Sequence, residues 1–138
     1  MAARQRQTYG EEVANVLTHG AGMLFGMTAI IVLMMAAIRS GNPWAIGSFA
    51  VYAVCMTLSY VTSTFYHAST HARQKRLLRR FDHGAIYLHI AGTYTPFTLL
   101  ALRQEGYWGW SLFAVIWIAA VIGVWLSFRK MRKKDHLK

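Results

Sequence analysis

The sequence predicts an all-α fold, a polytopic membrane helix bundle with four transmembrane helices. Three observations predict it: a high apolar content, four long segments without charge, and a turn with glycine and proline between the first two of these segments. Apolar residues make up 55% of the 138-residue chain and charged residues only 14%. Soluble domains usually carry about 25% charged residues. The composition therefore argues against a soluble domain.

The charge-free segments are each long enough to cross a bilayer. A helix needs about 20 residues to cross roughly 30 Å of hydrocarbon. A helix on the surface of a soluble protein would carry charge on its outer face. The segments without Asp, Glu, Lys or Arg lie between Glu12 and Arg39, Arg39 and Arg73, Asp82 and Arg103, and Glu105 and Arg129.

The first half of the chain predicts an N-terminal segment and two spans. Residues 1–17 form this segment, and its residues 11–17 can make a short amphipathic helix. The first span runs from about residue 18 to 38. The sequence Ser-Gly-Asn-Pro at 40–43 then breaks the helix, since glycine and proline favour turns. The second span follows at about 44–68.

The second half predicts two further spans. A basic loop at 71–80 precedes the third span, at about 82–102. Pro96 lies inside this span and should kink it. After a short loop at 103–106, the fourth span covers about 108–128. Together the four spans make a transmembrane domain, residues 18–128, followed by a basic tail, residues 129–138.

The net charge of +10 predicts an orientation. Basic residues gather at 71–80 and 129–138, whereas the loops at Arg39 and Arg103 have one each. The positive-inside rule then places both termini in the cytoplasm, in a protein of the cytoplasmic (inner) membrane. The basic segments would contact anionic membrane lipids. No basic, aromatic-interleaved surface exists outside them, which argues against a nucleic-acid partner.

Polar groups gather at one expected membrane depth. The first span begins with His19, the second ends with Ser63 and His67, and the third begins with Asp82. Polar residues in a span are costly and often mark functional sites. An imidazole, a carboxylate and a hydroxyl facing one cavity could bind a metal and its water, or relay protons. Alternatively, the histidines reach toward the interface and Asp82 caps a helix.

Helical spacing supports a shared site and close helix packing. Ser63 and His67 are four residues apart, on one helix face. The small residues Gly22 and Gly26 allow a close helix approach, although glycine is also common in membrane helices. A second stripe, spaced i, i+3 and i+7, consists of Glu12, Asn15 and His19.

Three ordered motifs resemble the bacterial hemolysin III family, which is related to the progestin and adipoQ receptors. The resemblance covers about residues 9–134. The motifs are Glu12-x2-Asn15-x3-His19, Ser63-x3-His67, and Asp82-His83-Gly84-Ala85-Ile86-Tyr87 leading into Ile90-Ala91-Gly92-Thr93-Tyr94-Thr95-Pro96-Phe97.

The resemblance implies seven helices with a zinc site near the cytoplasmic face. His67 matches a family zinc ligand, while Ser63 and Asp82 match residues that hold or activate the metal-bound water. The first motif, with Glu12, Asn15 and His19, has a less settled role. Relatives are grouped with membrane hydrolases of lipid amides, which implies a metal-dependent amide hydrolase.

The sequence departs from the family pattern after the fourth span. Helices five to seven, with the family's closing H-x3-H ligands, are expected to be missing. We therefore expect a fragment of a zinc-dependent hydrolase scaffold that is inactive alone and forms a homo-oligomer to cover exposed polar faces. His67 and His71 have a substitute H-x3-H spacing, and His89 inherits no role. The alternatives are a pore-forming or membrane-perturbing hemolysin and a non-enzymatic membrane sensor.

Overall fold

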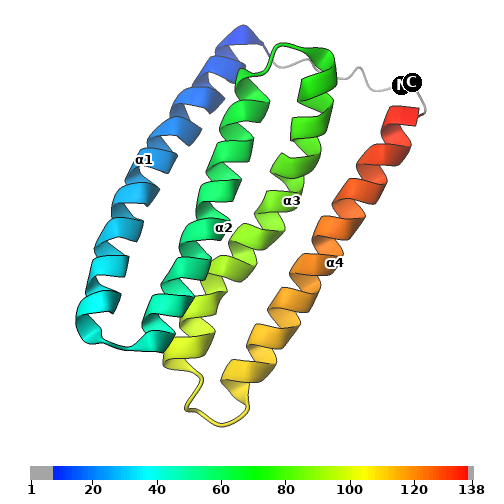
Figure 1. Cartoon of the computed structure of the whole chain (residues 1–138). Helices are drawn as coiled ribbons and strands as arrows, with labels where there is room; N and C mark the ends of the chain where they lie inside the picture. Colours follow the sequence, from blue (N-terminus) through cyan, green and yellow to red (C-terminus); the bar gives the residue numbers. More distant parts are fainter. Residues whose placement is uncertain (1–7, 137–138) are drawn as a thin grey trace.

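Long helices make up almost all of the computed structural model, which describes residues 8–136 (Figure 1). The predicted all-α class is confirmed. Three helices of the described part are long and apolar enough to cross a membrane: α1, α2 and residues Trp108–Arg129 of α4. The elements are α1 (Tyr9–Ser40), α2 (Pro43–Ala68), α3 (Ala72–Pro96), the π-helix η1 (Phe97–Ala101) and α4 (Trp108–His136).

The helices lie side by side in chain order (Figure 1). Within residues 8–136, α1 packs on α2, α2 on α3, and α3 on α4, while η1 contacts α2, α3 and α4. Large apolar side chains such as Phe25 and Trp125 point away from these contacts and are 80% and 57% exposed. In a membrane protein such side chains face lipid, because lipid tails are as apolar as they are.

A capping box begins α1. The Glu11 backbone N–H donates to Thr8 Oγ1 at 3.3 Å, and Glu11 Oε2 accepts from the Thr8 backbone N–H at 2.7 Å. This reciprocal pair satisfies donors that a helix start leaves free. The helix then continues without a break to Ser40, so the expected short helix at 11–17 is continuous with the first span.

The turn between α1 and α2 has the predicted residues in the predicted roles. Gly41 ends α1 with a left-handed φ of 63°, a conformation that glycine adopts without steric cost. Asn42 Oδ1 caps α2 by accepting from the Trp44 backbone N–H at 3.0 Å. Pro43 is the first residue of α2, where its missing N–H costs no hydrogen bond.

The expected basic loop at 71–80 is instead the start of α3. Helix α2 ends at Ala68, His71 takes the N-cap position, and α3 begins at Ala72. Arg, Lys, Gln and Leu are good helix formers, and no glycine or proline interrupts this stretch. The early start adds several basic residues to α3, and α3 is not among the three helices with a long apolar stretch.

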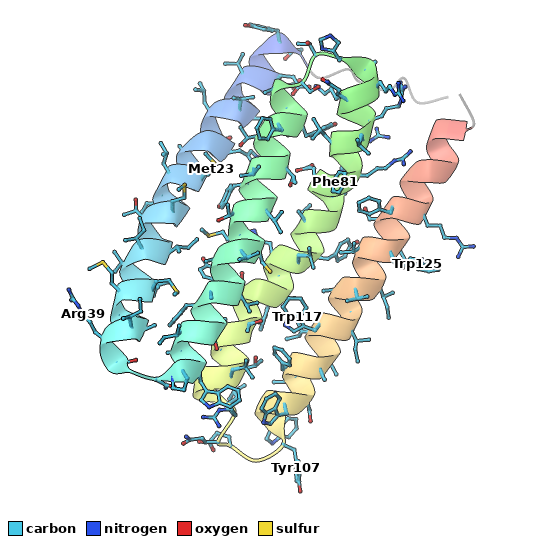
Figure 2. The ribbon with its side chains drawn as sticks, viewed as in Figure 1. Met23, Arg39, Phe81, Tyr107, Trp117 and Trp125 are labelled. Atoms are coloured by element: carbon cyan, nitrogen blue, oxygen red, sulfur yellow. The ribbon has the colours of Figure 1, made fainter. Side chains whose placement is uncertain are left out.

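Pro96 changes the helix type at the far end of α3. The next five residues form η1, in which the Leu102 backbone N–H donates to Phe97 O at 3.3 Å. Proline lacks an N–H and disrupts regular α-helical bonding. On α4, Trp117 faces α3 (Figure 2), and its Nε1–H donates to the buried Thr95 Oγ1 at 3.0 Å.

Small residues bring neighbouring helices together. A Cβ added at Gly26 would lie 2.5 Å from Met56 Cε, and one at Gly22 would lie 2.9 Å from Tyr60 Cε1. The predicted Gly22–Gly26 face therefore packs against α2. Buried Cys55 lies at a similar contact, with its Cβ 2.5 Å from a Cβ added at Gly92 of α3.

Candidate functional site

Three charged or titratable side chains meet where α1 begins, α2 ends and α3 begins. His67 Nδ1 lies 2.9 Å from Glu12 Oε2, and Lys75 Nζ donates to Glu12 Oε1 at 2.7 Å. The side chains of His67, Glu12 and Lys75 are 11%, 22% and 30% exposed. A carboxylate only accepts hydrogen bonds, so His67 donates from Nδ1 and its Nε2 remains for another partner. We call these three residues the Glu12 cluster.

Aromatic rings surround His67. The His19 and Tyr66 rings have centroids 5.7 and 4.8 Å from the His67 ring. Lys75 Nζ lies 5.4 Å from the centroid of the Tyr66 ring, within the range of a cation–π contact. The structure thus places two members of the first motif, Glu12 and His19, beside His67.

Of the other predicted site residues, Ser63 lies on α2, Asp82 on α3 and Asn15 on α1. Ser63 is buried, one helical turn before His67. Asp82 lies well inside α3 and therefore does not cap it; its Oδ2 is 3.6 Å from His83 Nδ1. His83 Nδ1 also lies 2.9 Å from the Arg79 carbonyl oxygen. Asn15 contributes its carbonyl oxygen, which accepts from Thr18 on the same helix.

A cavity of about 500 Å³ opens beside the Glu12 cluster. The first turns of α1 provide an apolar wall that includes Val13, Val16 and Leu17. The α2–α3 turn provides Ser69, whose buried Oγ has no hydrogen-bond partner in the described part of the chain. His67 therefore has an apolar approach on one side and polar contacts on the other.

Sequence reasoning missed Lys75 and Tyr60. In the sequence Lys75 is one of several basic residues at 71–80 and belongs to no motif, although a helix beginning at residue 72 would place it close to the end of α2. Tyr60 lies seven residues before His67, so both are on the same face of α2. Its ring centroid is 6.5 Å from His19 and 5.9 Å from His89, which had no assigned role.

The substitute metal pair of His67 and His71 is not formed on a helix, because α2 ends at Ala68. Among residues 8–136, no three His, Cys, Asp or Glu side chains are grouped closely enough to bind a metal ion. Catalytic zinc usually has three protein ligands and a water. His67 has the form of a single ligand, but the donors among the described residues do not fit a complete zinc site.

Comparison with known proteins gives a consistent result. Residues 7–138 match a family model described as Haemolysin-III related. The chain is 45% identical to Hemolysin-3 of Bacillus cereus over 121 residues, which cover 88% of this chain and 54% of that protein. It is 43% identical to the Hemolysin-3 homolog of Bacillus subtilis (strain 168) over 117 residues, 85% of this chain and 54% of that protein. The chain spans about half the length of these relatives, and no solved structure matches it.

Proposed function

The chain belongs to the haemolysin-III-related family of membrane proteins, and on this premise we propose that it provides four helices of a zinc-dependent membrane hydrolase scaffold. In this proposal His67 is one zinc ligand. The remaining ligands come from a region corresponding to the part of the longer relatives that this chain does not cover. The chain by itself is then inactive as a hydrolase.

The contact between Glu12 and His67 is the observation that carries this proposal. Histidines that bind metals usually donate their second ring N–H to a carboxylate or a carbonyl, which fixes the ring and leaves the other nitrogen for the metal. His67 has this arrangement, with Nδ1 2.9 Å from Glu12 Oε2 and a side chain only 11% exposed.

Ser63 and Asp82 complete the proposed catalytic group. Ser63 places a buried hydroxyl one turn from His67. A carboxylate can act as a general base when it lies within reach of the attacking water. We assign this role to Asp82, with a lipid amide as the substrate class. We place the proposed catalytic group toward the end of the bundle where α3 begins. The basic residues of α3 would orient this end to the cytoplasm.

Zinc content tests the proposal. The chain would be extended with the part of the Bacillus cereus relative that the match does not cover, purified, and analysed for zinc by mass spectrometry. We expect stoichiometric zinc in the extended protein, a markedly lower zinc content in His67→Ala, and unchanged zinc in His71→Ala, the matched control outside the Glu12 cluster. An extended protein without zinc, or full zinc in His67→Ala, contradicts the proposal.

Lysis is the second candidate, favoured by the name of both relatives. A pore-forming or membrane-perturbing protein would release dye from liposomes in proportion to the amount of protein. The polar contacts of the Glu12 cluster lie at one end of the helices rather than along a span. We therefore expect no release from liposomes, and dose-dependent release would replace the hydrolase proposal.

A further inference from the structure

We propose that Glu12 and Lys75 are positioning residues for His67: together they select the ring tautomer that carries its proton on Nδ1 and keeps Nε2 free. This gives a role to the acidic residue of the first motif and to a lysine outside all three motifs. The inference deepens the proposed function and takes its significance from it, because His67 is the ligand there.

Both oxygens of Glu12 are engaged by different partners. Oε2 faces His67 Nδ1 at 2.9 Å and Oε1 accepts from Lys75 Nζ at 2.7 Å. A carboxylate held through both oxygens has a fixed plane, so the oxygen facing His67 cannot rotate away without breaking the contact with Lys75. Hydrogen bonds that involve an ionised group are about twice as strong as neutral ones.

The backbone on either side of Glu12 is fixed as well. The capping box of Thr8 and Glu11 sets the first turn of α1, and the Glu12 backbone N–H donates to Thr8 O at 3.1 Å. Lys75 is held in the first turn of α3, where its backbone N–H donates to His71 O at 2.8 Å. Two helix starts therefore aim side chains at the end of α2.

The contacts are also long-range in sequence. Glu12 is 55 residues from His67 and 63 residues from Lys75. Helices α1 and α3 do not pack on each other in the described part of the chain, so the Glu12–Lys75 pair joins two helices at the end of α2 that otherwise have no contact. Exposed ion pairs contribute little to stability. The partial burial and shared carboxylate of this pair indicate a role in orienting His67 rather than a generic surface contact.

The fixed ring remains reachable. His67 lines the cavity of about 500 Å³ beside the Glu12 cluster. A ring held at Nδ1 and bordered by a cavity is suited to present Nε2 to a partner in one geometry. Free imidazole in water favours the opposite tautomer, so the tautomer of His67 reports directly on the positioning.

Nitrogen NMR of ring-labelled histidine tests the inference on the full chain in detergent, treated with chelator to remove metal and kept at alkaline pH. The His67 signals are assigned from their loss in His67→Asn. We expect a protonated Nδ1 and an unprotonated Nε2 in the wild type. In Glu12→Leu, which has no acceptor, we expect His67 to revert to the tautomer with the proton on Nε2.

Glu11→Gln is the matched control, because glutamine also serves in a capping box and the change is one residue away. It should leave the His67 signals unchanged. Lys75→Met should give mixed tautomers, whereas Lys75→Arg, which keeps a cation, should restore the wild-type spectrum. If Glu12→Leu does not fold, Lys75→Met decides, since it retains the carboxylate.

The proposal is overturned if wild-type His67 carries its proton on Nε2, or if its spectrum is the same in Glu12→Leu or in Lys75→Met as in the wild type. Failure of the proposed function would look different. If the extended protein contains no zinc but the tautomer shifts occur as expected, zinc binding is refuted and the positioning of His67 by Glu12 and Lys75 stands. If zinc binding depends on His67 but no tautomer shift occurs, the proposed function stands and the positioning role is refuted.

Discussion

The two ends of the helix bundle are stabilised by different kinds of interaction. At the basic end, where α1 begins and α3 starts with its basic turns, Glu12 makes directional polar contacts with other helices. At the aromatic end, which Arg39 and Tyr107 mark in Figure 2, aromatic rings pack edge to face. The Arg103 guanidinium lies 4.2 Å from the Trp44 ring, which meets the Trp110 ring at 5.8 Å.

The contacts at the aromatic end anchor helices, whereas those at the basic end position particular side chains. Aromatic rings packed edge to face tolerate small displacements, and tryptophans at a membrane interface anchor a helix without requiring one orientation. Hydrogen bonds to a carboxylate weaken steeply when their geometry changes. The basic end therefore has the contacts that a functional site needs, and the aromatic end has those that a stable interface needs.

The largest effect is expected from Glu12→Leu at the basic end. The change leaves His67 and Lys75, both partly buried, without their shared acceptor. Hydrogen bonds to charged groups contribute about 1.5–3 kcal/mol each, so we expect a loss of about 2 kcal/mol in the free energy of unfolding. Thermal unfolding in detergent measures it. A melting temperature equal to that of Glu11→Gln would show that the cluster does not bind the helices together.

An intermediate effect is expected from Trp117→Phe, between the two ends. Phenylalanine keeps most of the ring but lacks the Nε1–H that donates to Thr95 Oγ1 at 3.0 Å. Thr95 still donates to the Ala91 carbonyl at 2.8 Å, so its hydroxyl is not left without a partner. We expect a loss of about 1 kcal/mol. A loss as large as that of Glu12→Leu would remove the contrast between the ends.

The smallest effect is expected from Arg103→Gln at the aromatic end. The substitution removes the cation above the Trp44 ring, and cation–π contacts at exposed sites contribute about 0.5–1 kcal/mol. The histidine NMR spectrum should not change at all. A shift of the His67 signals in this variant would mean that the two ends are coupled, against the division drawn above.

The sequence predicted the structural features that are set by residues close together in the chain. The turn at Gly41 and Pro43 follows from local backbone chemistry, and the spans follow from the missing charge. Ser63, His67 and Asp82 could be named from motifs alone. The contact of Glu12 with His67 could not, because it joins residues 55 positions apart.

Lys75 shows why other parts of the site escaped prediction. Its charge has the same sign as that of its neighbours, and charge patterning explains all of them equally well by orientation in the membrane. Only the start of α3 at Ala72, in place of the expected loop, brings its amine to Glu12. Asp82 similarly required the structure, which places it beside His83 inside the helix rather than at a cap.

X-ray absorption at the zinc edge tests the central claim, that His67 is a metal ligand, most directly. The protein extended to the full length of its relatives would be compared with its His67→Ala variant under conditions where both retain some zinc. The account predicts one fewer imidazole among the zinc ligands of the variant. The same number of imidazole ligands in both proteins would contradict it.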